Sequence, residues 1–241
     1  ASANVSTWTK RFTSQAKKAA SYYNQSVFKK VSPKGSWSKS RKTSENGEPD
    51  WTPYILAIID TEHKLNSSSQ SDPANSRSRG SASSTAQGSC NYVASFLSDA
   101  YTKGKKLSPA ITSNLVFVQS YNMGLGYEDY LNSISQASNS TDATFEYSKR
   151  LAKARGNTGL SKTRYNTAQS KANGKEWIYS KGGNPYYYLE VSSRLSGSFD
   201  TSISVNATSA PSSQGKTESA ARKKYPYYAN IADAFAYASD S

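Results

Sequence analysis

Two carboxyl groups and an imidazole lie near the end of the stretch YILAIIDTEHK, residues 54–64. They are Asp60, Glu62 and His63, which is the only histidine of the chain. Two isoleucines share the helix face of Glu62, so we expect this carboxyl at the edge of the core. Partial loss of solvent favours the neutral form of a carboxyl group, and the C-terminal end of a helix dipole acts in the same direction. A carboxyl that stays protonated near neutral pH can act as a general acid.

The other two groups fit such chemistry less well. Asp60 points roughly 160–200° away from Glu62 around a helix of about 3.6 residues per turn, so the two carboxyls cannot easily serve one substrate atom. His63 is interpreted as a surface or capping residue near a helix C-terminus. A Ser-His-Asp or Cys-His mechanism would depend on this single histidine and is not favoured. For Glu62 itself, the alternative is an ordinary polar residue at a helix end.

Apolar spacing and capping signals predict the helices that position these groups. Thr52 as N-cap and Pro53 as first helical residue begin a helix that runs to about residue 64. Further helices are predicted over residues 5–31, over about 85–102, from Ser108-Pro109 onward, and from Thr141 or Asp142 to about Arg155, where Gly156 ends the helix. In the third helix, Cys90 is interpreted as a core packing residue. After residue 196 we expect a short strand in TSISV and a terminal helix in YYANIADAFAYA.

Composition restricts the possible partners and cofactors. The 241 residues carry a formal net charge of +13, which favours an anionic partner such as nucleic acid, a membrane surface or an anionic cell wall. One cysteine excludes an internal disulfide framework, and one cysteine with one histidine argues against a structural zinc site. We expect no metal and no cofactor. No apolar run reaches transmembrane length. The small-residue start ASANVSTW is typical of an end left by signal-peptide cleavage.

Two stretches near Glu62 resemble the lysozyme-like peptidoglycan hydrolases of Gram-positive bacteria and their phages. PYILAIIDTEHK is similar to the family's AII-x-x-E-S-G helix, with Glu62 at the position of the catalytic glutamate and His63-Lys64 in place of Ser-Gly. DPANS, residues 72–76, resembles the family's D-P-M-Q-S, which lines the cleft. Its Asp, Pro and Ser match, whereas Ala and Asn replace Met and Gln. Gln70-Ser71 offers a second alignment for the Gln-Ser pair.

Three later stretches resemble the same family in the same order. TAQGSCNYVASFL is similar to S-I-x-Q-G-x-x-Y-F-A-S-L-L, and VQSYNMGLGYEDYL is similar to I-Q-A-Y-N-x-G-x-G-Y-x-D-Y. GGNPYYYLEV is similar to the closing Y-G-D-x-x-Y-V. The most specific of these motifs is YNxGxGYxDY. The ordered matches extend over about residues 5–195.

The resemblance implies a lysozyme-like α+β fold, mainly helical, with a glycan-binding cleft. A catalytic domain would span residues 1–195, with insertions at about 32–50 and 157–183, followed by an extension of unknown role over 196–241. The implied reaction is cleavage of the β-1,4 bond between N-acetylmuramic acid and N-acetylglucosamine. Glu62 would protonate the leaving glycosidic oxygen.

The resemblance leaves two mechanisms open. In hydrolysis a second carboxylate commonly takes part, and Asp72 is the candidate. Goose-type lysozymes and lytic transglycosylases can work with one glutamate, and in this group the substrate's own 6-hydroxyl can attack and give an anhydro product. The residues implied to bind the glycan are Asn75, Ser76, Gln119, Tyr121, Asn122, Gly124, Tyr127 and Tyr187.

The physical properties of the tyrosine-glycine motif agree with this role. Gly124 permits a tight turn and a close approach of the backbone to a ligand. The Asn122 amide offers donors and an acceptor to sugar hydroxyls, and Tyr121 and Tyr127 can present flat apolar faces with a polar tip. The alternative is a glycine-rich turn packed by core tyrosines. At least one tyrosine of 186–188 is expected in the core.

Three functions are therefore considered. The favoured one is a secreted or phage-borne peptidoglycan glycosidase that acts as a monomer at the cell wall, with glycan strands and anionic wall polymers as partners. The second is a non-catalytic protein that binds peptidoglycan or teichoic acid on a lysozyme-like scaffold. The third is a basic nucleic-acid-binding protein. It is not preferred, because the sequence contains no zinc-finger or RNP signature.

Overall fold

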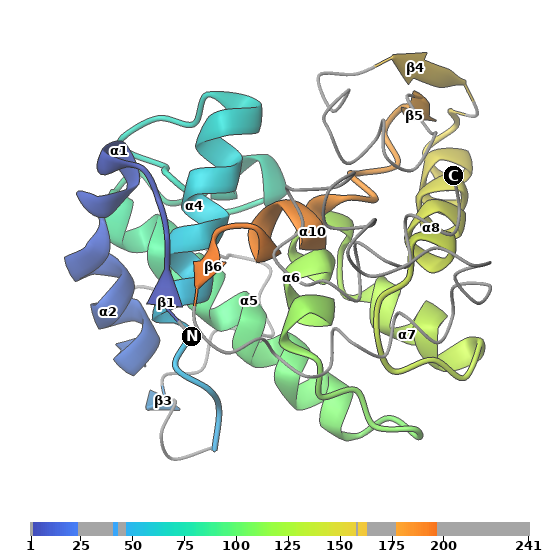
Figure 1. Cartoon of the computed structure of the whole chain (residues 1–241), viewed down its shortest axis with the longest axis horizontal. Coiled ribbons are helices and arrows are strands. Elements are labelled where there is room, and N and C mark those ends of the chain that lie inside the picture. Colours follow the sequence, from blue (N-terminus) through green and yellow to red (C-terminus); the bar gives the residue numbers. More distant parts are fainter. Residues whose placement is uncertain (1, 24–40, 43–46, 158, 163–176, 197–241) are drawn as a thin grey trace, which may run out of the picture. The chain divides into compact units, whose positions relative to one another are not determined.

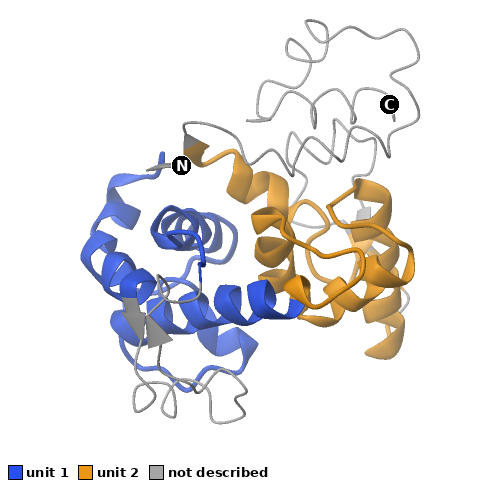
Figure 2. Cartoon of the chain, turned by 90° about the horizontal axis from the view of Figure 1, so that it is seen from below, with its two compact units in different colours: residues 1–103 blue, residues 104–241 orange. Residues whose placement is uncertain are grey.

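The computed structural model describes residues 2–23, 41–42, 47–157, 159–162 and 177–196 (Figure 1). These residues form mainly α-helices with a few strands of two or three residues, which confirms the predicted α+β, mainly helical class. The chain divides into two compact units, residues 1–103 and 104–241 (Figure 2). Much of the two predicted insertions lies outside the described residues, as does the tail after residue 196 with its predicted strand and helix.

The first unit is organised around its central helix, α4. Its elements, in order, are β1 (Ser2–Ala3), α1 (Thr7–Lys10), α2 (Thr13–Ser21), β2 (Tyr22–Tyr23), β3 (Arg41–Lys42), α4 (Thr52–Asn66), the 3₁₀ helix η2 (Ser76–Arg79) and α5 (Ala86–Lys105). Ile55, Ile58 and Ile59 of α4 have no exposed surface. Helix α2 packs against α4 and buries Ala16 and Ala19, whose small side chains allow a close approach. The apolar sequence of α4 thus produces a helix enclosed on several sides.

The predicted continuous helix over residues 5–31 is wrong. Helix α1 ends at Lys10, whose carbonyl accepts a hydrogen bond from the Thr13 hydroxyl at 2.7 Å. Helix α2 ends at Ser21, and β2 pairs antiparallel with β3. The two tyrosines of β2 favour extended backbone, and a partner strand far along the chain outweighs the helical spacing. Residues 24–31 of the predicted helix lie outside the described residues.

Helix α1 is attached to the last turns of α4. The Asp60 Oδ1 atom accepts hydrogen bonds from the Ser6 amide at 3.1 Å, the Ser6 hydroxyl at 2.8 Å and the Thr9 hydroxyl at 2.6 Å. The Trp8 ring stacks on the His63 ring with centroids 3.5 Å apart and planes 10° apart. The two helices lie side by side in Figure 1. These contacts fix the part of α4 that carries the candidate acid.

Helix α4 begins as predicted and extends slightly further. Pro53 lies in its first turn, and the N-cap residue is Trp51 rather than the predicted Thr52. The Thr52 amide donates to the Asp50 carboxylate at 3.0 Å, which satisfies one of the amides at the start of the helix. The helix ends at Asn66, followed by Ser67 in the left-handed conformation with φ 51°. Helix α5 agrees with the predicted 85–102 within three residues at its end.

The second unit contains the other helices. Its elements, in order, are α6 (Asn114–Met123), α7 (Gly126–Ser133), α8 (Thr141–Ala154), β4 (Leu160–Lys162), β5 (Trp177–Tyr179), α10 (Tyr187–Ser192) and β6 (Leu195–Ser196). Strands β4 and β5 pair antiparallel, with Ser161 opposite Ile178. Helix α8 confirms its prediction: the Ser140 side chain caps it, and Gly156 follows it at φ 71°.

The helix predicted from Ser108-Pro109 begins later than expected. Helix α6 starts at Asn114, after Ser113 in extended conformation. The Ile111 amide donates to the Gly104 carbonyl at 2.9 Å, which ties this segment to the preceding chain and keeps it out of the helix. A side chain at position 104 would collide with the Ile111 carbonyl, so glycine is required for this close contact.

A buried amide side chain joins α6 to α10. Gln119 has no exposed surface. Its Nε2 donates to the Asn184 carbonyl at 2.9 Å, and its Oε1 accepts from the Tyr188 amide at 2.9 Å. Figure 1 shows α10 beside α6. Gln119 thus satisfies main-chain groups of a segment almost seventy residues away.

Gln119→Leu is expected to lower the free energy of unfolding by about 2–4 kcal/mol, because it removes two buried hydrogen bonds and leaves the Tyr188 amide without its acceptor. Urea denaturation of the full chain measures this change. Gln70→Leu, at an exposed position, is the matched control and should change stability by less than about 0.5 kcal/mol. Equal effects of the two substitutions would contradict the bridging role.

Candidate functional site

Glu62 lies near the end of α4 and has no exposed surface. Its Oε1 accepts hydrogen bonds from Arg79 Nη1 at 2.9 Å, Asn75 Nδ2 at 3.3 Å and Asn66 Nδ2 at 3.3 Å. The Arg79 side chain is 16% exposed, so this ion pair is largely shielded from water. Such charge-assisted bonds are stronger than bonds between neutral groups. The sequence predicts Glu62 at the edge of the core with partial loss of solvent, whereas the structure encloses it completely and pairs it with Arg79.

The loop between α4 and α5 supplies two of these three donors. Asn75 adopts the left-handed conformation with φ 53°, which asparagine tolerates better than most residues. Gly80 follows Arg79 at φ 94°, a conformation that favours glycine. The Tyr92 hydroxyl of α5 donates to the Arg79 carbonyl at 2.8 Å. Helix α5 therefore holds the main chain of Arg79 while its side chain reaches Glu62.

Asp72 organises the same loop through both of its carboxylate oxygens. Oδ1 accepts from the Ser76 amide at 2.9 Å, the Ser76 hydroxyl at 2.6 Å and the Ser89 hydroxyl at 2.8 Å. Oδ2 accepts from the Arg77 amide at 2.9 Å and lies 3.4 Å from Arg77 Nε. Burial alone would raise the pKa of Asp72, but the hydrogen bonds from Ser76, Arg77 and Ser89 outweigh it and lower this pKa below its usual value. Asp72 is therefore ionised at neutral pH.

The candidate residues of DPANS, residues 72–76, make different kinds of contact. Asp72 and Ser76 bind each other, and Ser76 has no exposed surface. The Ala74 amide donates to the Ser89 hydroxyl at 3.1 Å, which fastens the loop to α5. Asn75 directs its amide to Glu62. Catalysis by Asp72 and glycan binding by Asn75 and Ser76 stay predictions.

The contacts of His63 agree with a capping role. Its Nδ1 lies 3.0 Å from the Ser68 carbonyl, just beyond the end of α4, and its ring is covered by Trp8. Asp60 accepts its bonds from the segment around α1, whereas Glu62 accepts from the α4–α5 loop and from α4 itself. The two carboxyls thus have different partners, as their spacing on the helix predicts.

Other chemistry finds little support in the described residues. Burial, with a smaller contribution from the charge of Asp72, raises the pKa of the Cys90 thiol to about 12, so the thiol stays protonated at neutral pH as its packing role suggests. In the described part of the chain, no group of three or more His, Cys, Asp or Glu residues is arranged to hold a metal ion. None of the described helices has the length and apolar character needed to cross a membrane.

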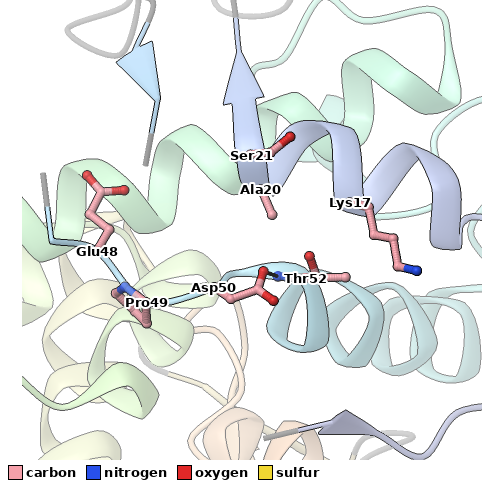
Figure 3. A pocket seen from close by; sticks show the side chains of 7 residues that line it. All are labelled: Lys17, Ala20, Ser21, Glu48, Pro49, Asp50 and Thr52. Carbon is pink, nitrogen blue, oxygen red and sulfur yellow. Dashed lines mark hydrogen bonds between the residues drawn. The ribbon is translucent and has the colours of Figure 1, made fainter. Parts of the chain in front are cut away.

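A pocket of about 480 Å³ lies away from these carboxyls, at the start of α4. Figure 3 shows residues of α2 on one side and residues at and before the start of α4 on the other; the lining consists of Lys17, Ala20, Ser21, Glu48, Pro49, Asp50 and Thr52. Glu48 is occupied by structural bonds to the Trp51 indole at 3.1 Å and the Ser98 hydroxyl at 2.5 Å. Neither Glu62 nor Asp72 lines this pocket.

In the second unit, the tyrosines implied to bind glycan are core residues. Tyr121 is 2% exposed, and Tyr127 and Tyr187 have no exposed surface. The Tyr127 hydroxyl donates to Asn139 Oδ1 at 2.8 Å, and burial raises the pKa of Tyr127 well above its usual value. These contacts favour the alternative of tyrosines that pack a glycine-rich turn. Binding of a glycan by their flat faces stays a prediction.

The polar members of the motif fix the turn after α6. Asn122 Oδ1 accepts from the Asn184 amide at 2.6 Å. Gly183, at φ 79°, lies so close that a Cβ there would be 2.8 Å from the same oxygen. Gly124 follows α6 at φ 91°, and a Cβ added there would meet no atom within 4 Å, so its backbone conformation rather than crowding favours glycine. Asn122 and Gly124 are partly exposed, whereas Gln119 is enclosed by its bonds to α10.

Of the residues that donate hydrogen bonds to Glu62, one could have been identified from the sequence and one could not. Asn66 follows Glu62 by four residues, a helical spacing that places the two on one face and could have identified it. Arg79 is seventeen residues away across an irregular loop. No periodicity connects it to Glu62, and the sequence shows it only as one cation of SRSRG.

Asp72→Asn is expected to lower the free energy of unfolding at neutral pH and to make it vary less with pH in the acid range. Because the folded pKa of Asp72 is lowered, its stabilisation is present above the usual value of 3.8 and is lost as pH falls through the folded value. Urea denaturation at pH 7, 5 and 3 should show a difference from wild type that shrinks at pH 3. Asp142→Asn, at an exposed position of α8, is the control. A constant difference at all three pH values would contradict this account.

Comparisons with known proteins agree with the resemblance seen in the sequence. A family model described as Lysozyme-like matches residues 38–195, more than half of the chain. A search of curated proteins finds no match. Among solved structures, the chain is similar to the crystal structure of a "similar to lipoprotein, NLP/P60 family" protein from Staphylococcus aureus subsp. aureus Mu50, with 21% sequence identity and a TM-score of 0.58.

That alignment covers 82% of this chain and 57% of the staphylococcal chain, so this chain spans little more than half of its length. At such identity the likeness concerns the fold alone. The family match rests on residues that include α4, the loop with Asp72 and Arg79, and the turn after α6. The chain belongs to the lysozyme-like family.

Proposed function

We propose that this chain is a peptidoglycan glycosidase that cleaves the β-1,4 bond between N-acetylmuramic acid and N-acetylglucosamine. The observation that carries the proposal is the environment of Glu62 within a lysozyme-like domain. This carboxyl is enclosed on α4 and oriented by Asn66, Asn75 and Arg79. Fixed donors around a shielded carboxyl are a common way to position a group that transfers protons.

In the proposed reaction, Glu62 gives its proton to the leaving glycosidic oxygen as the bond from that oxygen to the anomeric carbon breaks. The resulting carboxylate then takes a proton from the attacking hydroxyl. If water attacks, the product is a reducing muramic acid; if the substrate's 6-hydroxyl attacks, the product is an anhydromuramic acid. Each route restores the Glu62 proton.

The contacts of Asp72 favour the route that uses one glutamate. Its two oxygens accept bonds from Ser76, Ser89 and Arg77, and the residue is 4% exposed. Because the oxygens of Asp72 already accept these hydrogen bonds, the carboxylate is better suited to holding the loop in shape than to activating a water molecule for attack. We therefore assign to Asp72 the role of ordering the loop that carries Asn75 and Arg79.

A non-catalytic wall-binding protein is the second candidate. It is favoured by the ion pair that occupies Glu62 and by His63-Lys64 at the positions where the family has Ser-Gly. In that case the fold would bind glycan without turnover.

Glu62→Gln is expected to abolish the release of soluble fragments from purified Gram-positive sacculi, because the amide cannot give up a proton as an acid does. Digests of wild type and variant are compared by mass spectrometry. Glu146→Gln, at an exposed position of α8, is the control and should digest like wild type. Reducing muramic acid ends would indicate hydrolysis, and anhydromuramic ends would indicate transglycosylation. Undiminished digestion by Glu62→Gln would refute the proposal, and binding without digestion by wild type would favour the second candidate.

We also propose that anionic wall polymers such as teichoic acids are partners of this chain, which would act outside the cell as a monomer. Ten of the thirty Lys and Arg residues lie within residues 1–44, a segment without Asp or Glu. The cations of this segment on α1, at its end and on α2 are exposed: Lys10, Arg11, Lys17 and Lys18. Exposed cations close together along the chain attract a flexible polyphosphate at low ionic strength.

Replacing Lys10, Arg11, Lys17 and Lys18 by glutamine should weaken binding to teichoic-acid-bearing walls about tenfold at low salt, and the difference should shrink as salt is raised. The control replaces four exposed lysines elsewhere, at positions 106, 149, 153 and 181, and so changes the net charge equally. Pelleting with walls, before and after teichoic acid extraction, measures the binding. Equal losses in both variants would mean that net charge alone attracts the wall.

A further inference from the structure

The enclosure of Glu62 has a consequence for how substrate reaches it. The carboxyl has no exposed surface, so a glycosidic oxygen cannot contact it until a neighbouring group moves aside. This inference rests on the proposed function, in which Glu62 must touch that oxygen. The group that moves should be one whose departure still allows Glu62 to donate a proton.

Among the donors to Glu62, Arg79 is the one best able to leave. Asn66 lies on α4 itself, one turn after Glu62. Asn75 belongs to the loop that Asp72 holds through Ser76 and the Arg77 main chain. The Arg79 side chain has a long flexible stem and is partly exposed, while its main chain is held separately by Tyr92. Its Nη1 atom also donates to the Asn75 carbonyl at 3.1 Å and to the Ser78 hydroxyl at 3.2 Å, so the guanidinium gives up these two contacts as well when it swings outward.

Departure of Arg79 must be compensated, because an ionised carboxyl left buried without its cation is strongly unfavourable. A carboxylate of the ligand can take over the guanidinium, while a proton from solvent neutralises Glu62. A guanidinium binds one carboxylate much as it binds another, through a planar fork of donors. Muramic acid carries such a group on its lactyl side chain or on the attached stem peptide, whereas a glycan of N-acetylglucosamine alone has none.

We propose that Arg79 is a specificity-determining residue, which exchanges the Glu62 carboxylate for a carboxylate of the muramyl residue as the glycan binds. As Arg79 leaves, Glu62 takes up a proton from solvent, so that no charge stays buried without a partner. The proton then goes to the glycosidic oxygen. A neutral glycan cannot draw Arg79 away and therefore meets a covered acid.

The neighbouring Arg77 provides a matched control. It lies on the same 3₁₀ helix, two residues earlier, and its side chain is 49% exposed. Its guanidinium is bound to Asp72 and, through Nη2, to the Ser71 hydroxyl at 2.8 Å. Substitution of Arg77 removes the same charge from the same helix without removing the partner of Glu62.

The test compares kcat/KM on four soluble glycans: peptide-free strands with free lactyl carboxylates, peptide-bearing strands, and each of these with its carboxylates converted to methylamides. Wild type should prefer charged over neutralised strands by about tenfold or more. Preference confined to the peptide-free pair would identify the lactyl carboxylate, and preference confined to the peptide-bearing pair would identify the stem peptide. Both outcomes support the exchange.

Arg79→Gln should reduce this preference to about one, with a gain on the neutralised strands, whereas Arg77→Gln should keep the wild-type preference. Arg79→Lys keeps the charge but loses the planar fork of donors, so it should lower the preference about threefold. This variant tests the proposal if Arg79→Gln does not fold. If a folded Arg79 variant keeps the wild-type preference, the role proposed for Arg79 is overturned, but the proposed glycosidase function is not. Failure of wild type to cleave every strand would instead remove the proposed function.

Discussion

The burial of a carboxyl on an apolar helix is the constraint on which the first unit depends. Glu62 has no exposed surface, and α4 around it is almost entirely core. A buried carboxylate needs donors and preferably a cation, because the protein interior cannot solvate it as water does. Arg79, Asn75 and Asn66 meet that need. The loop between α4 and α5 must therefore hold one shape.

Asp72 and Tyr92 give the loop that shape. Asp72 accepts hydrogen bonds from the start of η2 and from Ser89 of α5, and the Tyr92 hydroxyl of α5 donates to the carbonyl at the end of η2. Both ends of the short 3₁₀ helix are thus tied to one long helix. The bonds of Asp72 and Tyr92 hold the backbone from which Arg79 and Asn75 reach Glu62, and Arg79 adds a bond of its own to the Asn75 carbonyl at 3.1 Å.

The second unit shows how a sequence motif can combine packing with function. Within the stretch that resembles a glycan-binding motif, Tyr121 and Tyr127 are buried, and Gln119 connects α6 to α10. Asn122 and Gly124 remain partly exposed at the turn after α6. The buried members hold the turn in place, and the exposed members are the ones that a ligand could contact. A similar motif in a relative therefore does not give every one of its residues the same task.

The sequence by itself determined the class of fold, the start of α4, the place of Glu62 against the core, and the order of motifs that led to the family. These features depend on local periodicity, on start signals such as Pro53, and on residue types, which can be read within one or two helical turns. The tertiary structure decided the break between α1 and α2, the late start of α6, and the pairing of Arg79 with Glu62. Each of these depends on groups far apart along the chain, and their energies are set by burial and by distance in space, for which sequence spacing carries no signal.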